Sequence, residues 1–185
     1  MAICSPLVGI PKDCGDNNLG AIKRALIGSF EDVTGLTVTA TNNPDTDGEV
    51  TAIIRTVGTK FEDFPLTKDT SMFNQDWSGD LVADTHSYTQ NVELGFRRID
   101  LRKRNAISLL AAGRRDLIAV VQDNNDDWWM LGADQGLRLS ANSAATNNTR
   151  AAGQQMPVTL TSENERHMLY AVDSAIVEAL LIAAV

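Results

Sequence analysis

Residues that commonly carry out chemistry are scarce in this sequence. Its 185 residues include two cysteines, Cys4 and Cys14, and two histidines, His86 and His167. Two cysteines are too few for a disulfide framework, and no histidine lies near them in the sequence to complete a zinc site. We therefore expect reduced thiols, as in the cytoplasm, and a fold that its hydrophobic core holds together without disulfides or metal.

Catalytic motifs are missing too. The sequence contains neither a G-x-S-x-G nucleophile elbow nor a phosphate-binding P-loop. Asp84 and Ser87 lie beside His86, but adjacency in the sequence does not create the geometry of a catalytic triad. The sequence therefore predicts no enzymatic activity, no catalytic residue, no cofactor and no metal site.

Long apolar runs are also absent. The most apolar segment, AIVEALLIAAV at residues 175–185, is eleven residues long, whereas a membrane-spanning helix needs about 20. The opening MAICSPLVGIPKD lacks a basic region followed by a long apolar core, so we expect neither a signal peptide nor a membrane span.

Two acidic segments resemble metal-binding loops. NPDTDGE, from Asn43 to Glu49, matches the opening of an EF-hand loop, but Ile54 stands where the twelfth-position glutamate belongs. DNNDD, from Asp123 to Asp127, lacks the glycine that the bend of such a loop needs. Because Asn and Asp side chains bond to nearby backbone and Gly supplies positive φ, both segments are predicted to be turns.

The charge is unevenly distributed. The net charge is -8, yet residues 97–115 hold seven of the sixteen basic residues. An acidic protein is a poor general binder of nucleic acid, although a basic helix can contact phosphate. The same segment could be a solvated helix face. A third interpretation fits best: a basic patch that meets an acidic surface of an identical neighbour. The candidate interface residues are Arg102, Arg104, Arg114 and Arg115.

The hydrophobic pattern predicts a mainly β fold. Tyr88–Phe96 alternates between a dry face and a wet face, and Glu93 lies on the wet face. Apolar residues at helical spacing predict a helix over 100–113, with Asp100 as its cap. Further strands are predicted over 21–28, 36–40, 50–56, 116–122, 128–133, 136–140, 157–161 and 166–172. Residues 175–185 are ambiguous between strand and helix.

These elements predict a single domain over 1–185, an antiparallel β-sandwich or barrel with one packed helix. Residues 1–20 are predicted to be an extended N-terminal arm. Residues 60–85 are predicted to be a long loop, and a long loop in a compact domain usually serves function or assembly. Phe73 and Trp77 are therefore candidate interface residues.

Adjacent tryptophans follow the DNNDD segment. Trp128 and Trp129 are predicted to lie in a strand, where successive side chains point to opposite faces. They cannot form one stacking platform for nucleic acid. We expect one to enter the core and the other to meet a neighbouring subunit, since an outward indole favours an interface.

The C-terminal half resembles the tail tube proteins of tailed bacteriophages. The resemblance lies in DLIAVVQDNNDDWWMLGADQGLRLS, followed by a polar loop and MPVTLTSENERHMLYAVD. The opening CSPLVGIPKDCGDNNLGAIKRALIGSFEDV is similar to the N-termini of related virion proteins. The resemblance implies a β-sandwich or barrel with a helix at its side, hexameric rings that stack into a tube, and an acidic lumen through which DNA passes.

The sequence thus predicts a self-assembling virion subunit, assembled in the bacterial host cytoplasm and located in the phage tail. Its partners would be copies of itself and other tail or neck proteins, with DNA passing transiently through a lumen to which Glu93 contributes. A single-ring connector, collar or tail terminator is the first alternative. A nucleic-acid-binding module that uses Arg97–Arg115 is the second, and a calcium-dependent protein is the least favoured.

Overall fold

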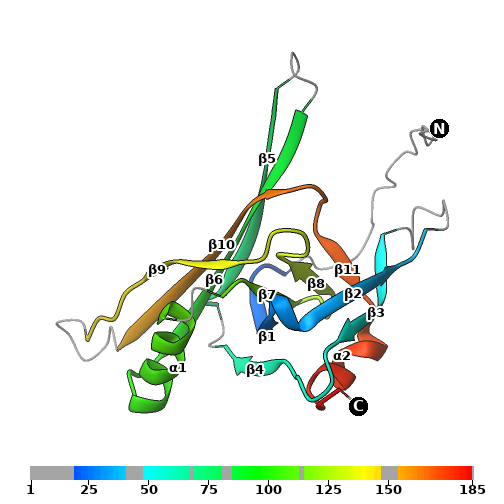
Figure 1. Cartoon of the computed structure of the whole chain (residues 1–185). Helices are drawn as coiled ribbons and strands as arrows, with labels where there is room; N and C mark the ends of the chain where they lie inside the picture. The colour runs from blue at the N-terminus through cyan, green and yellow to red at the C-terminus, as the bar shows by residue number, and fades with distance from the viewer. Residues whose placement is uncertain are drawn as a thin grey trace.

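The computed structural model describes residues 19–40, 48–66, 69–80, 85–112, 115–146 and 154–184. Within these ranges the chain is mainly β, as the sequence predicts, with strands in two sheets and two α-helices (Figure 1). The strands are β1 (Ile22–Ser29), β2 (Val33–Val38), β3 (Glu49–Arg55), β4 (Glu62–Pro65), β5 (Met72–Asp80), β6 (Thr85–Arg97), β7 (Leu117–Asp123), β8 (Trp128–Leu131), β9 (Arg138–Asn142), β10 (Gln155–Glu165) and β11 (Tyr170–Val172).

Both sheets are open. The larger sheet has the order β2-β3-β11-β8-β7-β1-β4, and the smaller sheet has the order β5-β6-β10-β9. Neighbouring strands are antiparallel, except that β11 runs parallel to β3. In the described part of the chain β2, β4, β5 and β9 are therefore edge strands. The sandwich prediction is confirmed, and the barrel alternative does not apply to these sheets.

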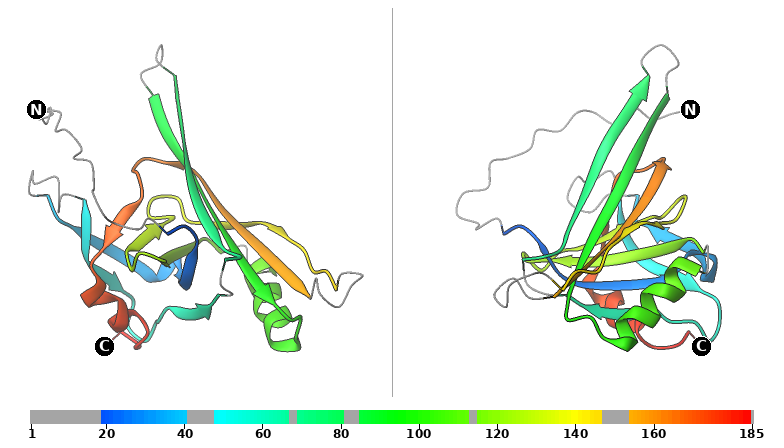
Figure 2. Two further views of the ribbon diagram at one scale, coloured as in Figure 1. Left: turned by 180° about the vertical axis from the view of Figure 1, so that it is seen from behind. Right: turned by 90° about the vertical axis from the view of Figure 1, so that its left-hand side faces the viewer.

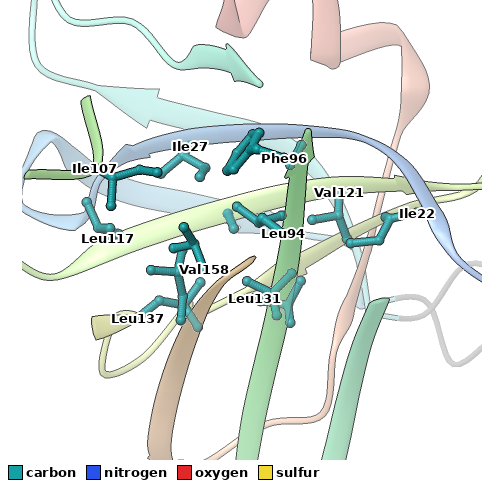
Figure 3. Packing of buried hydrophobic residues seen from close by; sticks show 14 of the residues in the cluster. Ile22, Ile27, Leu94, Phe96, Ile107, Leu117, Val121, Leu131, Leu137 and Val158 are labelled. Atoms are coloured by element: carbon teal, nitrogen blue, oxygen red, sulfur yellow. The ribbon is translucent and has the colours of Figure 1, made fainter. Parts of the chain in front are cut away.

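The main hydrophobic core lies between the two sheets (Figure 3). The smaller sheet contributes Val92, Leu94 and Phe96 of β6 together with Val158 of β10. Residues from the larger sheet meet them, and Leu117, Ala119 and Val121 of β7 all point into this cluster. The dry face predicted for 88–96 is thus confirmed: its alternation buries one side of β6 against the other sheet.

A second cluster covers the opposite face of the larger sheet. Ile118 and Val120 of β7 alternate with the residues above, and they pack with Trp128 and with the C-terminal helix α2 (Ser174–Leu180). The fold therefore has three layers, and β7 is buried on both faces. The ambiguity of the apolar tail is resolved as a helix, in which Asp173 caps the first turn by accepting a hydrogen bond from the N–H of Ala175 at 2.9 Å.

The predicted helix is present as α1 (Leu101–Ala112), within one residue of its predicted start and end. Ile107 is the residue that anchors it, since it is 3% exposed and belongs to the core between the sheets. Asp100 caps α1 as predicted, because its carboxylate accepts a hydrogen bond from the N–H of Lys103 at 2.8 Å. The presence of α2 corrects the prediction of a single helix.

Residues 60–85 do not form the long loop that the sequence predicts. Their described part contains β4 and the nine-residue β5, which pairs with β6 from Met72↔Glu93 to Asp80↔Thr85. β10 follows β6 only as far as Tyr88, opposite Glu165. Beyond that point the hairpin has two strands, and it projects from the body of the molecule in all views (Figure 2).

Most other predicted strands are confirmed with small shifts in their ends. The β2–β3 hairpin is antiparallel as expected, while its turn at 41–47 lies outside the described residues. Gly48 has a φ of 86°, in keeping with the predicted turn. β10 is longer than predicted and β11 is shorter. Residues 1–18 of the predicted arm, which include both cysteines, also lie outside the described ranges.

Candidate assembly surfaces

The described residues do not gather chemistry-bearing side chains into one site. No group of three or more His, Cys, Asp or Glu residues that could hold a metal ion occurs among them. His86 packs edge-on against Tyr88 with ring centroids 6.2 Å apart, and His167 packs against Tyr170 at 5.7 Å. Neither described helix is long and apolar enough to cross a membrane.

The acidic segment at 123–127 is a polar hairpin turn between β7 and β8, as the sequence predicts. Asp123 Oδ1 accepts hydrogen bonds from the backbone N–H groups of Asn125 at 2.8 Å and Asp127 at 3.0 Å. Asp126 has a φ of 77° and its carboxylate pairs with Lys23. Asn125 also bonds to the backbone of Leu19 through its side chain, so the turn is attached to the residues that precede β1.

The two tryptophans lie on opposite faces of β8, but both contact the protein's own core. Trp128 is 7% exposed and packs in the second cluster, with the guanidinium of Arg24 at 6.0 Å from its ring centroid. Trp129 is half-buried against the main core, 6.5 Å from the ring of Phe73, and its Nε1 donates to Asp123 Oδ2 at 3.3 Å. One tryptophan thus enters the core as predicted, while Trp129 packs partly against the protein's own core and its contact with a neighbouring subunit stays a prediction.

The outward tryptophan is instead Trp77, on the projecting hairpin. It is 59% exposed, and its indole lies over Gly79, where an added Cβ would come within 2.3 Å of the ring. Trp77 is the register partner of Tyr88, and Gly79 that of His86. We call residues 77–80 and 85–88 the hairpin tip. In the sequence, this surface is indicated only by a single tryptophan, Trp77, among polar residues.

The basic segment is displayed on the surface at the other end of β6. Its described arginines are exposed and form no ion pair within the described residues; they are Arg97, Arg98, Arg102, Arg104 and Arg115. Arg114 lies outside the described residues. At the end of β6, Lys103 Nζ donates a hydrogen bond to the carbonyl of Arg97 at 2.6 Å. The N–H of Lys103 and its nearby ammonium hold the pKa of Asp100 below its ordinary value.

A groove of about 740 Å³ separates α1 from the edge strand β4. Its lining is mostly apolar: Phe64 and Pro65 come from β4, Phe96 from the end of β6, and Ala106 and Ile107 from α1. The Phe64 and Phe96 rings are 6.2 Å apart. We call this feature the β4–α1 groove. Sequence reasoning missed it, because β4 was not predicted and the groove joins segments distant in the sequence.

The face of the smaller sheet that points away from the core is polar. Ser140 Oγ lies 2.8 Å from Thr161 Oγ1, which in turn donates to Asn91 Oδ1 at 2.7 Å, so a hydrogen-bonded row crosses β9, β10 and β6. Register places Asp76 and Glu93 on the same face. Glu93, the candidate lumen residue, is half-buried beside this row.

Comparisons of the chain with protein-family models, curated proteins and solved structures found no match. The function of this chain is therefore inferred from its own residues and surfaces.

Proposed function

We propose that the protein is a structural subunit of a phage tail tube, which assembles into rings that stack around a channel for DNA. The observation that carries this proposal is the outer face of the smaller sheet. That face carries mostly hydroxyl, amide and carboxylate groups, including the row through Asn91 and Thr161 and the acids Asp76 and Glu93, together with the exposed Met72 and the arginines Arg97 and Arg138. A wall of this kind repels phosphate, so that DNA can slide along it without binding.

The exposed arginines on this sheet do not oppose that use. Arg97 lies at the end of β6, and Arg138 on the edge strand β9 pairs with Asp116, its Nε 2.5 Å from Oδ1. The other exposed arginines of residues 97–115 lie on or next to α1 instead. Apart from Arg97 and Arg138, the polar face and the basic surface are separate, as expected for a subunit with a channel wall and a contact surface.

The edges of the smaller sheet support side-by-side assembly. Both β5 and β9 are edge strands in the described chain, and an edge strand presents unpaired backbone groups that can pair with another chain. Joining β5 of one copy to β9 of the next would extend the polar face into a continuous wall. Heterologous contacts of this kind close into rings when the rotation between copies allows it.

Electron microscopy of the purified protein tests the proposal directly. Negative-stain images over a wide range of protein and salt concentrations should show rings and stacked tubes, and the family resemblance implies six subunits in each ring. Persistent monomers under all conditions would contradict the proposal. Isolated rings that never stack would favour a connector or terminator role instead.

A further inference from the structure

We propose that the hairpin tip of one copy docks into the β4–α1 groove of a second copy, with Trp77 as the anchor. This inference rests on the proposed function, for which it supplies the contact between stacked subunits. Its evidence is separate, because it comes from a projecting aromatic residue and an open apolar groove on the same chain.

The two surfaces lie at opposite ends of one strand. β6 has thirteen residues and runs from Thr85 at the hairpin tip to Arg97 beside α1 (Figure 1). A strand of this length spans about 40 Å. The tip therefore cannot reach the groove of its own copy. A contact between them must join two copies, and it leaves a free tip on one copy and a free groove on the other.

The tip has the form of an anchor. Beyond Tyr88 its two strands have no third strand beside them in the described chain, and Trp77 is 59% exposed. The indole is placed against Gly79, where a side chain would collide with the ring. Binding would therefore immobilise few further bonds, and buried tryptophans are among the residues that contribute most to interfaces.

The groove has the form of a receptor for an aromatic side chain. The rings of Phe64 and Phe96 lie within it, and its volume of about 740 Å³ exceeds the space that a single indole needs. Ala106 leaves room on the helix side. Phe96 is already buried in the core, so filling the groove would mainly remove the half-buried ring of Phe64 from water, which favours association.

The charges of the two surfaces are complementary. Asp80 lies in the hairpin tip and Asp76 directly below it on β5, and the register places both on the face of the hairpin opposite to Trp77. Arg102 lines the groove and makes no ion pair among the described residues. Three carboxylates line it: Asp63 is held by Arg24 through two bonds of 3.1 Å, Glu62 lies 3.2 Å from Lys60, and Asp100 lies 3.6 Å from Lys103. The unpaired Arg102 therefore favours an acidic segment as the binding partner.

Zero-length cross-linking tests the docking in the native sequence. A carbodiimide joins a carboxylate to an amine that it touches, and Lys103 lines the groove. We would mix copies labelled with light and heavy nitrogen and identify linked peptides by mass spectrometry. Mixed-isotope peptides joining Asp76 or Asp80 to Lys103 are expected. Lys103→Arg, which keeps the charge and removes the amine, should lose the link.

Matched variants test the contact from both sides. Trp77→Ala removes the anchor and Ala106→Glu obstructs the groove, and each should raise the concentration needed for stacking about tenfold or more. The controls are Val57→Ala, at an apolar position that is 73% exposed, and Ser108→Glu, which adds the same charge to an exposed position of α1. Both controls should stack as the unmodified chain does, and all four proteins should retain their melting temperature.

Mixing the two defective variants separates docking from a general loss of assembly. Each variant keeps one intact surface, so the mixture should form pairs that neither variant forms alone. Tubes that survive both substitutions would overturn the docking contact and leave the tube proposal in place. Cross-linked pairs in a protein that never forms tubes would support the docking contact and overturn the tube proposal. A monomeric protein without cross-links would overturn both.

Discussion

At the scale of single residues, Glu165 is a buried carboxylate that forms no ion pair with another described residue. It is 1% exposed and accepts hydrogen bonds from the hydroxyl of Ser162 and from the N–H groups of Asp134 at 2.8 Å and Gln135 at 3.1 Å. Glu165→Gln replaces one acceptor with a donor that faces these donors, so urea unfolding should show a loss of about 1–3 kcal/mol. The exposed neighbour Glu163→Gln should change stability by less than about 0.5 kcal/mol. An equal loss of stability in the two variants would show that the Glu165 carboxylate does not hold the loop that contains Asp134 and Gln135.

The tryptophan pair shows what a local sequence pattern can and cannot predict. Strand geometry correctly separates Trp128 from Trp129, because side-chain alternation is a property of the strand itself. It could not show that both faces of the sheet are covered, since the covering layers come from β6 and β10 on one side and α2 on the other. Exposure is decided by these distant segments. Of the three tryptophan candidates, Trp77 is the most exposed, and its role remains a prediction.

At the scale of elements, α2 is attached to the larger sheet through Arg55 of β3. The guanidinium donates to the carbonyls of Ala179 and Leu180, each at 3.0 Å, and also to those of Thr59 and Ile182. A cation at this position also complements the C-terminal end of the helix dipole. Burial lowers the pKa of Arg55 from its ordinary value, and the side chain has hydrogen bonds to all these carbonyls in compensation.

Replacing this side chain should loosen the C-terminal helix. Arg55→Met keeps much of the shape but leaves carbonyls without donors, so we expect a loss of about 2–4 kcal/mol in urea unfolding and faster hydrogen exchange over 174–184. Arg166→Met is the matched control, since Arg166 is exposed and its side chain makes no hydrogen bond or ion pair in the described chain. Unchanged exchange in Arg55→Met would mean that α2 is held by its apolar contacts alone.

Strands whose buried apolar residues form a regular pattern could be predicted from the sequence, whereas the exposed strand β5 could not. β6 and β7 bury alternating or continuous apolar residues, so their patterns carry the signal. β5 is exposed along most of its length, and its order comes from pairing with β6, which leaves no hydrophobic period to detect. The tail 175–185 is apolar enough for a strand or a helix. Its cap at Asp173 and the position of Val177 and Leu180 against the second cluster favour the helix.

At the scale of the whole molecule, charge is sorted by surface. The net charge is -8, while several exposed arginines gather near α1 and the polar face of the smaller sheet carries Asp76 and Glu93. In the proposed tube this sorting leaves few cations on the channel wall. It also leaves the basic surface for contact with acidic parts of other copies, such as the hairpin tip.

Reversing one charge on the polar face should therefore change how the assembly treats DNA. Glu93→Arg places a cation in every subunit of the wall, and phosphate neutralisation makes such binding strong at low salt and weak at high salt. Assemblies of this variant should retain duplex DNA in a filter assay at low salt, whereas the unmodified chain should not. Glu31→Arg, an equal charge change at an exposed residue of the short 3-10 helix Phe30–Asp32, is the control and should retain none. Salt-sensitive retention by the unmodified chain would instead favour nucleic-acid binding through Arg97–Arg115, because those arginines are the exposed cations already present.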